Sequence, residues 1–227
     1  MELNSEPGVQ QVEGNDDATE EKSKLCFYIR SKLNFCPSID VSNWKGNGFD
    51  FSFSKENIGI CFALNASSSL AKSEYIVYFN DDMYACPDWD YWLFKEVELQ
   101  KSDYFFLSST MIEPLDTNNS CVIAPQNFGD NPNNFDEKKL LDTFRDFKKD
   151  DWTGATWPPN LVPKKLWDLV GGYSTEFSPG MYSDPDFSMK LWNVGVRNFK
   201  GVSKSRIYHF MSKSTKKLNF KNLSLCI

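Results

Sequence analysis

The chain alternates between apolar runs and amphipathic stretches, a pattern that predicts strands and helices in turn. Residues 75–79 form a continuous apolar run, which is typical of a central strand covered on both faces. Aromatic and polar residues alternate over 49–53, as they do in a half-buried strand. Further strands are expected over residues 8–12, 104–108, 121–124 and 206–210.

Helices are predicted between most of these strands. Leu25, Ile29 and Leu33 lie on one face of a helix expected over 18–33, and the aspartates that precede it are suitable caps. Proline is favoured at the start of a helix and glycine just past its end, which supports two later helices. The further helices are expected over 60–72, 89–100 and 136–148, from Pro163 to Gly171 and from Asp184 to Gly195, with an exposed loop over 127–134.

The alternation of strands and helices indicates an α/β fold. A chain of 227 residues suits one large domain, and its 7 Trp, 9 Tyr and 19 Phe supply ample apolar area for a core. The N-terminal segment 1–23 is polar and the segment 213–227 is basic, so the domain is expected to occupy residues 24–212.

Charge and cysteine usage narrow the possible partners and the compartment. The net charge of −6 argues against nucleic acid as the partner, because phosphate binding needs clustered Lys and Arg. The six cysteines form no C-x-x-C pair, which indicates reduced thiols in the cytoplasm. The longest apolar runs are too short to span a bilayer. Lysines in the tail 213–227 suit peripheral contact with a membrane, although a solvated tail is the alternative.

The triplet Asn80-Asp81-Asp82 is the sharpest candidate for a functional site. It follows the apolar strand 75–79, and ligands of open α/β sheets bind beyond the carboxyl ends of strands. Two carboxylates at such a place attract a hard divalent cation. An ordinary Asn/Asp turn explains the triplet equally well on its own.

Other polar residues are candidates for the same site. Asn57 and Gly59 stand on a turn and Asn65 on an early helix, where they suit close approach to a ligand or merely a turn. Asp184 and Asp186 stand at a helix start, where Asp184 is either a base or simply an N-cap. His209, the single histidine, lies near the end of the last strand, and a lone histidine is more often structural than a ligand.

The order of these features resembles that of a family 2 glycosyltransferase with the GT-A fold. The matching stretches are Asn57 to Asn65, Ala71 to Asp82, Pro87 to Trp89, Gly171 to Tyr173, Ser183 to Phe187 and Tyr208 to Phe210. The resemblance extends over about residues 47–215 and implies a Rossmann-like nucleotide-diphospho-sugar transferase fold, with a mixed central sheet flanked by helices.

The resemblance also implies roles for the candidate residues. Asp82 and His209 would bind a divalent metal, Mn²⁺ or Mg²⁺, on the diphosphate of the donor. Asp184 would accept the proton of the acceptor hydroxyl, and Asp186 would support it. The nucleotide pocket would be formed by Asn57, Gly59, Asn65, Asn80 and Asp81.

These roles imply a metal-dependent enzyme that moves a sugar from a nucleotide-diphosphate donor to a hydroxyl acceptor. A base opposite the leaving group predicts direct displacement with inversion at the sugar carbon. Glycans or glycolipids are the acceptors implied by the family. A nucleotidyltransferase would need basic residues aimed at a triphosphate, and Lys and Arg are sparse near these motifs.

The sequence departs from the family pattern at three points. Asn80 stands where many members have an acidic residue, and Ser183 stands where many have Glu. The first βα unit of the fold is apparently missing, since residues 8–20 resemble the second strand and its loop. The competing hypothesis is therefore a catalytically silent GT-A-like module that binds a nucleotide sugar or a protein.

Overall fold

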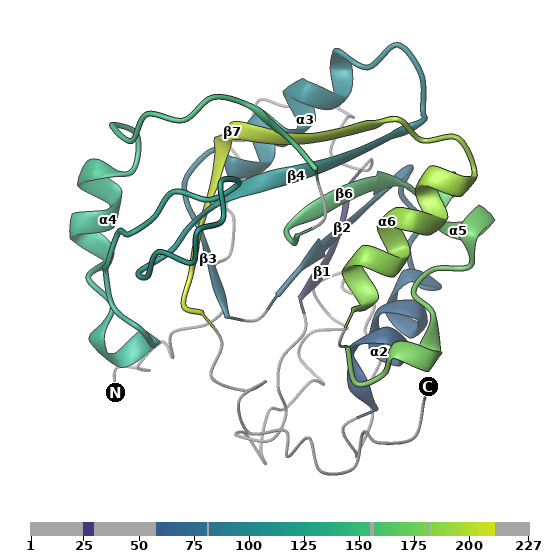
Figure 1. The fold of residues 1–227 in the computed structure, drawn as a ribbon, viewed down its shortest axis with the longest axis horizontal. Coiled ribbons are helices and arrows are strands. Elements are labelled where there is room, and N and C mark those ends of the chain that lie inside the picture. Colours follow the sequence, from purple (N-terminus) through teal and green to yellow (C-terminus); the bar gives the residue numbers. More distant parts are fainter. Residues whose placement is uncertain (1–24, 30–57, 81, 155–156, 181, 212–227) are drawn as a thin grey trace, which may run out of the picture.

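The computed structural model describes residues 25–29, 58–80, 82–154, 157–180 and 182–211, which form a mixed sheet with helices packed against it (Figure 1). The strands are β1 (Leu25–Ile29), β2 (Tyr75–Phe79), β3 (Met83–Ala85), β4 (Phe105–Ile112), β5 (Trp152–Thr153), β6 (Asn160–Pro163) and β7 (Asn198–His209). The helices are α2 (Gly59–Ser68), α3 (Trp89–Glu98), α4 (Glu137–Thr143), α5 (Lys164–Val170) and α6 (Ser183–Asn193), with 3-10 turns η2 (Pro132–Asn134) and η3 (Thr175–Phe177).

The order of the strands brings several carboxyl ends to one edge of the sheet. The order is β1-β2-β6-β4-β7-β3, and β5 pairs with β7. β1 is parallel to β2, β4 is parallel to β7, and β6 is antiparallel to both β2 and β4. β1, β2, β4 and β7 therefore run in one direction, so the residues at their carboxyl ends face the same side of the molecule.

Alternating residues of the strands form a core on each face of the sheet. On one face, Tyr78 of β2 and Phe106 of β4 pack with residues of α2, α5 and α6. On the other face, Val77 and Leu107 pack with residues of α3. A third cluster joins the end of β7 to α4, which Figure 1 shows at the opposite side of the molecule from α5 and α6. Burial on both faces explains why β2 is a continuous apolar run.

Several predicted elements are confirmed. The run 75–79 forms β2, and the helix predicted from Asp184 is α6, followed by Gly195 at a positive φ of 107°. The helix predicted from Pro163 is α5, which ends at Gly171 in the left-handed conformation. The helices predicted over 60–72 and 89–100 are α2 and α3, each with slightly shorter bounds.

Other predicted elements are wrong or differ in extent. Within the range 18–33, where a helix was predicted, residues 25–29 form β1, because the apolar residues that suit one helix face also suit a strand beside β2. The range 121–124 makes a single bridge between Ile123 and Ile112 in place of a strand. β6 was not predicted, since its four buried residues lie between a double proline and a helix.

Some sequence predictions fall outside the described residues. These are the strands over 8–12 and 49–53, the whole basic tail 213–227, and the segment 8–20, from which the absence of the first βα unit was predicted. The cysteines with described side chains, Cys61, Cys86 and Cys121, are free thiols. The described helices include none that is both long and apolar enough to cross a membrane.

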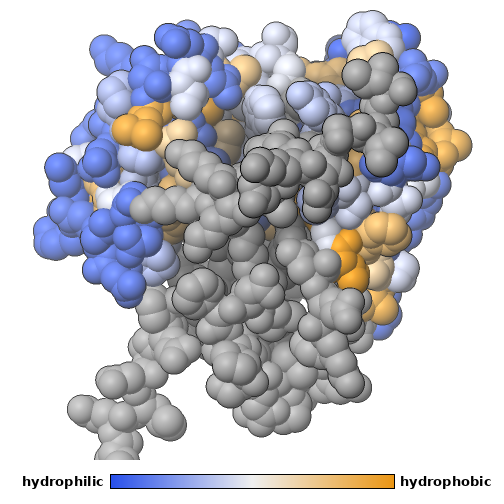
Figure 2. All heavy atoms as spheres, turned by 60° about the horizontal axis from the view of Figure 1, so that its bottom comes forward, coloured by the Kyte–Doolittle hydropathy of each residue, from blue (hydrophilic) through white to orange (hydrophobic). Residues whose placement is uncertain are grey.

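Apolar side chains are exposed on the side of the sheet that α2, α5 and α6 cover. They include Phe62 of α2, Leu169 of α5, and Met189 and Trp192 of α6. Figure 2 shows apolar residues on this side of the visible face, whereas the side of α4 is mainly hydrophilic.

Candidate active site

The pairing of β3 with β7 brings Asp82 beside His209. Met83 pairs with His209 in the antiparallel register, so Asp82 lies next to the end of β7. The main chain closes this arrangement, because the Phe210 N–H donates to the Asp82 carbonyl at 3.0 Å. Asp81 lies outside the described residues, as does Asn57. The structure thus brings together the two residues predicted to bind metal.

The imidazole of His209 lies between two carboxylates. Its Nε2 is 3.5 Å from Asp82 Oδ2, and its Nδ1 is 2.8 Å from Glu113 Oε1. The side chains of His209 and Asp82 are 18% and 17% exposed, and that of Glu113 is 6% exposed. Burial alone would lower the pKa of His209, but hydrogen bonds and charges from Asp82 and Glu113 outweigh it and raise the pKa to about 9.

The donor set of Asp82 and His209 fits a divalent cation that also binds a diphosphate. Mg²⁺ commonly takes one or two carboxylates from a protein and completes its shell with substrate phosphates and water. Imidazole suits several transition metals, and Mn²⁺ also accepts carboxylate oxygens. Within the described residues, no group of three or more His, Cys, Asp or Glu is arranged to hold a metal ion. The pair therefore fits a shared metal site completed by a ligand.

Asp184 lies at the start of α6, but it does not cap the helix. Tyr182 occupies the N-cap position, and no side chain caps the helix there. The Asp184 carboxylate instead accepts a hydrogen bond of 2.8 Å from the Tyr173 hydroxyl. Burial raises the pKa of Asp184 to about 6, although the hydrogen bond from Tyr173 lowers it in part. A carboxyl group with this pKa suits proton transfer near neutral pH.

Asp186 and Asn65 hold the turn that precedes α6. The Ser174 hydroxyl donates to Asp186 Oδ2 at 2.6 Å. Asn65 of α2 binds the main chain of Tyr173 twice: its Nδ2 donates to the carbonyl at 2.8 Å, and its Oδ1 accepts from the N–H at 2.9 Å. These contacts join α2, the turn at Tyr173 and the start of α6 into one unit.

Gly59 begins α2 at a place where the backbone passes close to another turn. Its φ is +77°, and a Cβ there would overlap Ser178 Oγ and the backbone of Pro179. The Ile60 N–H donates to the Pro179 carbonyl at 3.1 Å. The glycine is therefore required by the packing of α2 against the segment before α6.

Buried aromatic residues connect the Asp184 group with the end of β2. The Tyr78 hydroxyl donates to Asn80 Oδ1, and the rings of Tyr78 and Tyr173 meet edge to face with centroids 5.9 Å apart. Asn160 of β6 pairs with Tyr78 in the sheet and is 1% exposed. A chain of contacts thus runs from Asn80 through Tyr78 and Tyr173 to Asp184.

Two residues of this site were missed as functional candidates in the sequence. Glu113 follows β4 directly, as Asn80 follows β2, and a charge just after an apolar strand is a usable signal. The predicted strand ended at Ser108, four residues before β4 does, so this signal was hidden. Tyr173 belongs to the Gly171-Gly-Tyr173 motif. Its separation from Asp184 along the chain does not predict the hydrogen bond between these two side chains.

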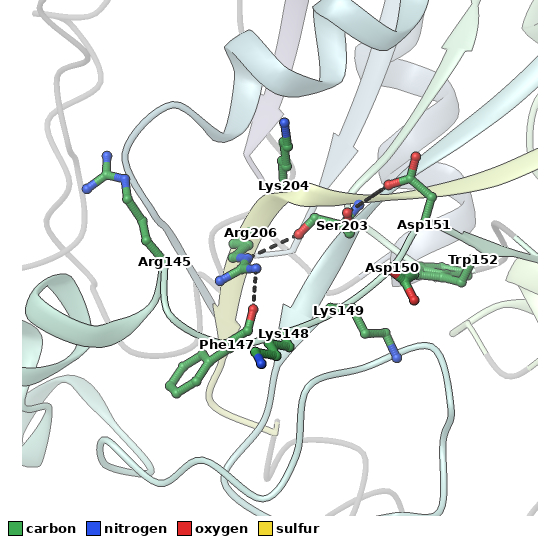
Figure 3. Close-up of a pocket in the computed structure, with 10 residues that line it drawn as sticks. All are labelled: Arg145, Phe147, Lys148, Lys149, Asp150, Asp151, Trp152, Ser203, Lys204 and Arg206. Atoms are coloured by element: carbon green, nitrogen blue, oxygen red, sulfur yellow. Dashed lines mark hydrogen bonds between the residues drawn. The ribbon is translucent and has the colours of Figure 1, made fainter.

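A basic pocket of about 820 Å³ lies between the segment 145–152 and β7 (Figure 3). None of the predicted site residues lines it. The Arg206 guanidinium donates to the carbonyls of Phe144, Phe147 and Ser203, and Figure 3 shows the charged ends of Arg145, Lys149 and Lys204 pointing in different directions. The cations do not converge on one point, so the candidate active site remains at the carboxyl edge of the sheet.

Comparison with known proteins identifies the fold. No model of a protein family and no curated protein matches the sequence. Among solved structures, 69 chains are similar, including the crystal structure of GalNAc-T7 with UDP, GalNAc and Mn²⁺, a GT-A glycosyltransferase from a family other than family 2. That match has a TM-score of 0.53 and 14% sequence identity, and it covers 82% of this chain. This chain spans 37% of the length of the GalNAc-T7 chain.

The mixed sheet, its flanking helices and this similarity define a GT-A glycosyltransferase-like fold. The α/β class and the mixed sheet predicted from the sequence are confirmed. The similarity extends to the fold.

Proposed function

We propose that the chain is a metal-dependent inverting glycosyltransferase, similar to family 2 enzymes, that transfers a sugar from a nucleotide-diphosphate donor to a hydroxyl acceptor. One observation carries the proposal: His209 Nε2 faces the Asp82 carboxylate at 3.5 Å, at the end of the strand that the motif places there. The binding of UDP and Mn²⁺ by GalNAc-T7, which has a similar fold, supports it.

The donor site comprises the end of β2 and the neighbouring turn. Asp82 and His209 would hold the divalent cation, which would supply positive charge to stabilise the diphosphate leaving group. Asp81 and Asn80 bind near the ribose, and Asn80 is oriented by the hydroxyl of Tyr78. Asn57, Gly59 and Asn65 belong to the same nucleotide site, with Asn65 acting through its bonds to the Tyr173 main chain.

Asp184 is the proposed general base. Its carboxylate takes the proton of the acceptor hydroxyl while that oxygen bonds to the anomeric carbon of the sugar. The bond between the anomeric carbon and the diphosphate oxygen breaks, and the nucleoside diphosphate leaves with that electron pair. Attack from the opposite face inverts the configuration. Asp186 supports the base by fixing Ser174 and the turn beside it.

The acceptor is proposed to be a glycan or glycolipid. The protein is proposed to lie in the cytoplasm and to contact a membrane peripherally through the segment 213–227. The transferase domain is proposed to occupy residues 24–212, between the polar segment 1–23 and this tail. A catalytically silent module that binds a nucleotide sugar is the second candidate, favoured by Asn80 and Ser183 at positions where many family members are acidic.

Calorimetric titration of the chain with UDP, GDP and dTDP, each with and without Mn²⁺, tests the proposal. We expect metal-dependent binding of one nucleotide and its loss in Asp82→Ala. The matched control is Asp103→Ala, which removes an exposed carboxylate paired with Lys165 away from these motifs. Nucleotide binding that is equally strong in Asp82→Ala would contradict the proposed donor site.

Turnover then separates the two candidate functions. An enzyme should consume the nucleotide sugar in the presence of an acceptor, and Asp184→Asn should abolish transfer while it leaves nucleotide binding intact. Metal-dependent binding without transfer to any acceptor would favour the silent module.

A further inference from the structure

Glu113 is a buried carboxylate in contact with the proposed metal ligand. It follows β4 and is 5% exposed as a residue. In the parallel register of β4 and β7, Ile112 pairs with Tyr208, so the next residues along the two strands, Glu113 and His209, are neighbours. Burial of a carboxylate is costly unless the carboxylate is paired and hydrogen-bonded. The contact with His209 provides this pairing for Glu113.

The main chain holds Glu113 in a fixed place. Its N–H donates to the Ile123 carbonyl at 2.9 Å, and its carbonyl accepts from the Gln126 N–H at 2.8 Å. The side chain can therefore serve as a rigid support for the imidazole, in contrast to an exposed carboxylate on a mobile stem.

The two nitrogens of His209 face different partners. Glu113 Oε1 lies 2.8 Å from Nδ1, which is a full hydrogen bond, whereas Asp82 Oδ2 lies 3.5 Å from Nε2. A carboxylate bonded to Nδ1 keeps the proton on that nitrogen, so Nε2 is the nitrogen that gives up its proton when the ring binds a cation. Nε2 thereby faces the Asp82 carboxylate, the other proposed ligand of the cation.

We infer that Glu113 is a positioning residue that orients His209 for metal binding, by accepting the Nδ1 proton and presenting Nε2 toward the Asp82 side. Metal-binding histidines commonly donate their other ring N–H to a carboxylate, which fixes the ring and strengthens its donor nitrogen. The inference rests on the proposed function only through the metal that Asp82 and His209 hold.

A purely structural role for Glu113 is the alternative. In that role the pair would only neutralise two buried groups where β3, β4 and β7 meet, and its loss would lower stability without a specific effect on metal. Another buried carboxylate provides the matched control: Glu96 of α3 is 9% exposed and forms a 2.7 Å ion pair with Lys200.

The test compares Glu113→Gln with Glu96→Gln in the full chain, with Mn²⁺ alone as the probe. Calorimetry measures Mn²⁺ affinity, and electron spin-echo modulation of bound Mn²⁺ detects a coordinated histidine nitrogen, which can only come from His209. We expect Glu113→Gln to weaken Mn²⁺ binding by about 10–100-fold and to diminish the nitrogen coupling. Glu96→Gln should change neither measurement, although both variants should unfold at a lower temperature than the wild type.

Each outcome supports or overturns the inference. Unchanged Mn²⁺ affinity and nitrogen coupling in Glu113→Gln would make Glu113 purely structural, and a wild-type chain that binds no Mn²⁺ through His209 would also overturn its role. If Glu113→Gln does not fold, Glu113→Asp keeps the charge but withdraws the carboxylate by one methylene, and the same loss of affinity is expected. A chain that binds Mn²⁺ through His209 but binds none of UDP, GDP and dTDP would instead refute the proposed function and leave this inference standing.

Discussion

At the scale of the residue, the surroundings of Asp184 suit its proposed role as general base. Its pKa is raised to about 6 by burial, and the Tyr173 hydroxyl fixes its orientation at 2.8 Å. We expect the rate of sugar transfer at saturating substrate to rise with pH through about 6 and then to level off, because Asp184 must be deprotonated to accept the proton. A pH profile of kcat measures this, and an acidic limb far from this value would contradict the assignment.

Tyr173→Phe is the control for this pH profile. The hydrogen bond from Tyr173 lowers the pKa of Asp184, so its removal should move the acidic limb to higher pH and reduce kcat. Tyr104→Phe removes a tyrosine hydroxyl from an exposed residue elsewhere and should leave the profile unchanged.

The same buried carboxyl group should reduce stability at neutral pH. The pKa of Asp184 is about 6 in the folded chain and near its usual value of 3.8 in the unfolded chain. Between these values the folded chain binds more protons, so the contribution of Asp184 to the free energy of unfolding falls as the pH rises through this window. Asp184→Asn should therefore unfold at a higher urea concentration than the wild type at pH 7.5. Its free energy of unfolding should be larger by up to about 3 kcal/mol. Equal stability at pH 7.5 would show that the ionised carboxylate is not penalised.

Residue roles could be proposed from the sequence only where a motif carries them. Asp82, Asp184 and His209 were found because the order of their motifs resembles that of a known family. The place of Glu113 depends on the register of β4 against β7, and the bond of Tyr173 to Asp184 depends on how a turn packs against α6. Contacts of this kind follow from tertiary packing, which spacing along the chain does not specify.

At the scale of the element, Asn65 fastens α2 to the turn before α6. Its amide satisfies both main-chain groups of Tyr173, at 2.8 and 2.9 Å. Gly172 has a φ of +64°, and a Cβ there would overlap Asn65 Oδ1, so the turn leaves no room for a larger residue. Asn65, which belongs to a stretch that resembles a nucleotide-binding motif in the sequence, therefore also stabilises the packing of α2.

Asn65→Ala should consequently destabilise the fold. Two main-chain groups of Tyr173 would lose their partners, at a cost of about 1–3 kcal/mol in the free energy of unfolding. Urea unfolding at constant pH measures the change. Asn119→Ala removes a local hydrogen bond to the Cys121 N–H in a loop and should have a smaller effect. Wild-type stability of Asn65→Ala would mean that the two hydrogen bonds to Tyr173 contribute little to the stability of the fold.

The elements that the sequence predicted well have strong local signals. β2 is a continuous apolar run, and α5 and α6 carry proline at or near the start and glycine just past the end. β1 and β6 lack such signals. The spacing of Leu25 and Ile29 suits a helix face, whereas pairing with β2 makes these residues a strand, and β6 is a short buried strand identified only by its neighbours.

At the scale of the whole molecule, one property of the sheet explains the site. β2, β4 and β7 run in the same direction, so Asp82, Glu113 and His209 meet at one edge although they are far apart in the sequence. The core on one face then carries the contacts from Tyr78 to Tyr173 and on to Asp184. The fold thus holds the proposed metal ligands and the proposed base in a single framework.

A ligand that binds this framework should stabilise the whole chain. Mn²⁺ with its nucleotide at about 100 times the dissociation constant should add about 2.7 kcal/mol to the free energy of unfolding, because only the folded state has the site. For a chain of 227 residues this corresponds to a rise in Tm of about 5–10 °C. Thermal unfolding should show no such rise for Asp82→Ala, which lacks a proposed metal ligand, and the full rise for Asp184→Asn, which lacks only the proposed base. A rise of equal size in Asp82→Ala would place the nucleotide elsewhere, whereas loss of the rise in Asp184→Asn would make Asp184 part of the binding site in addition to its role as base.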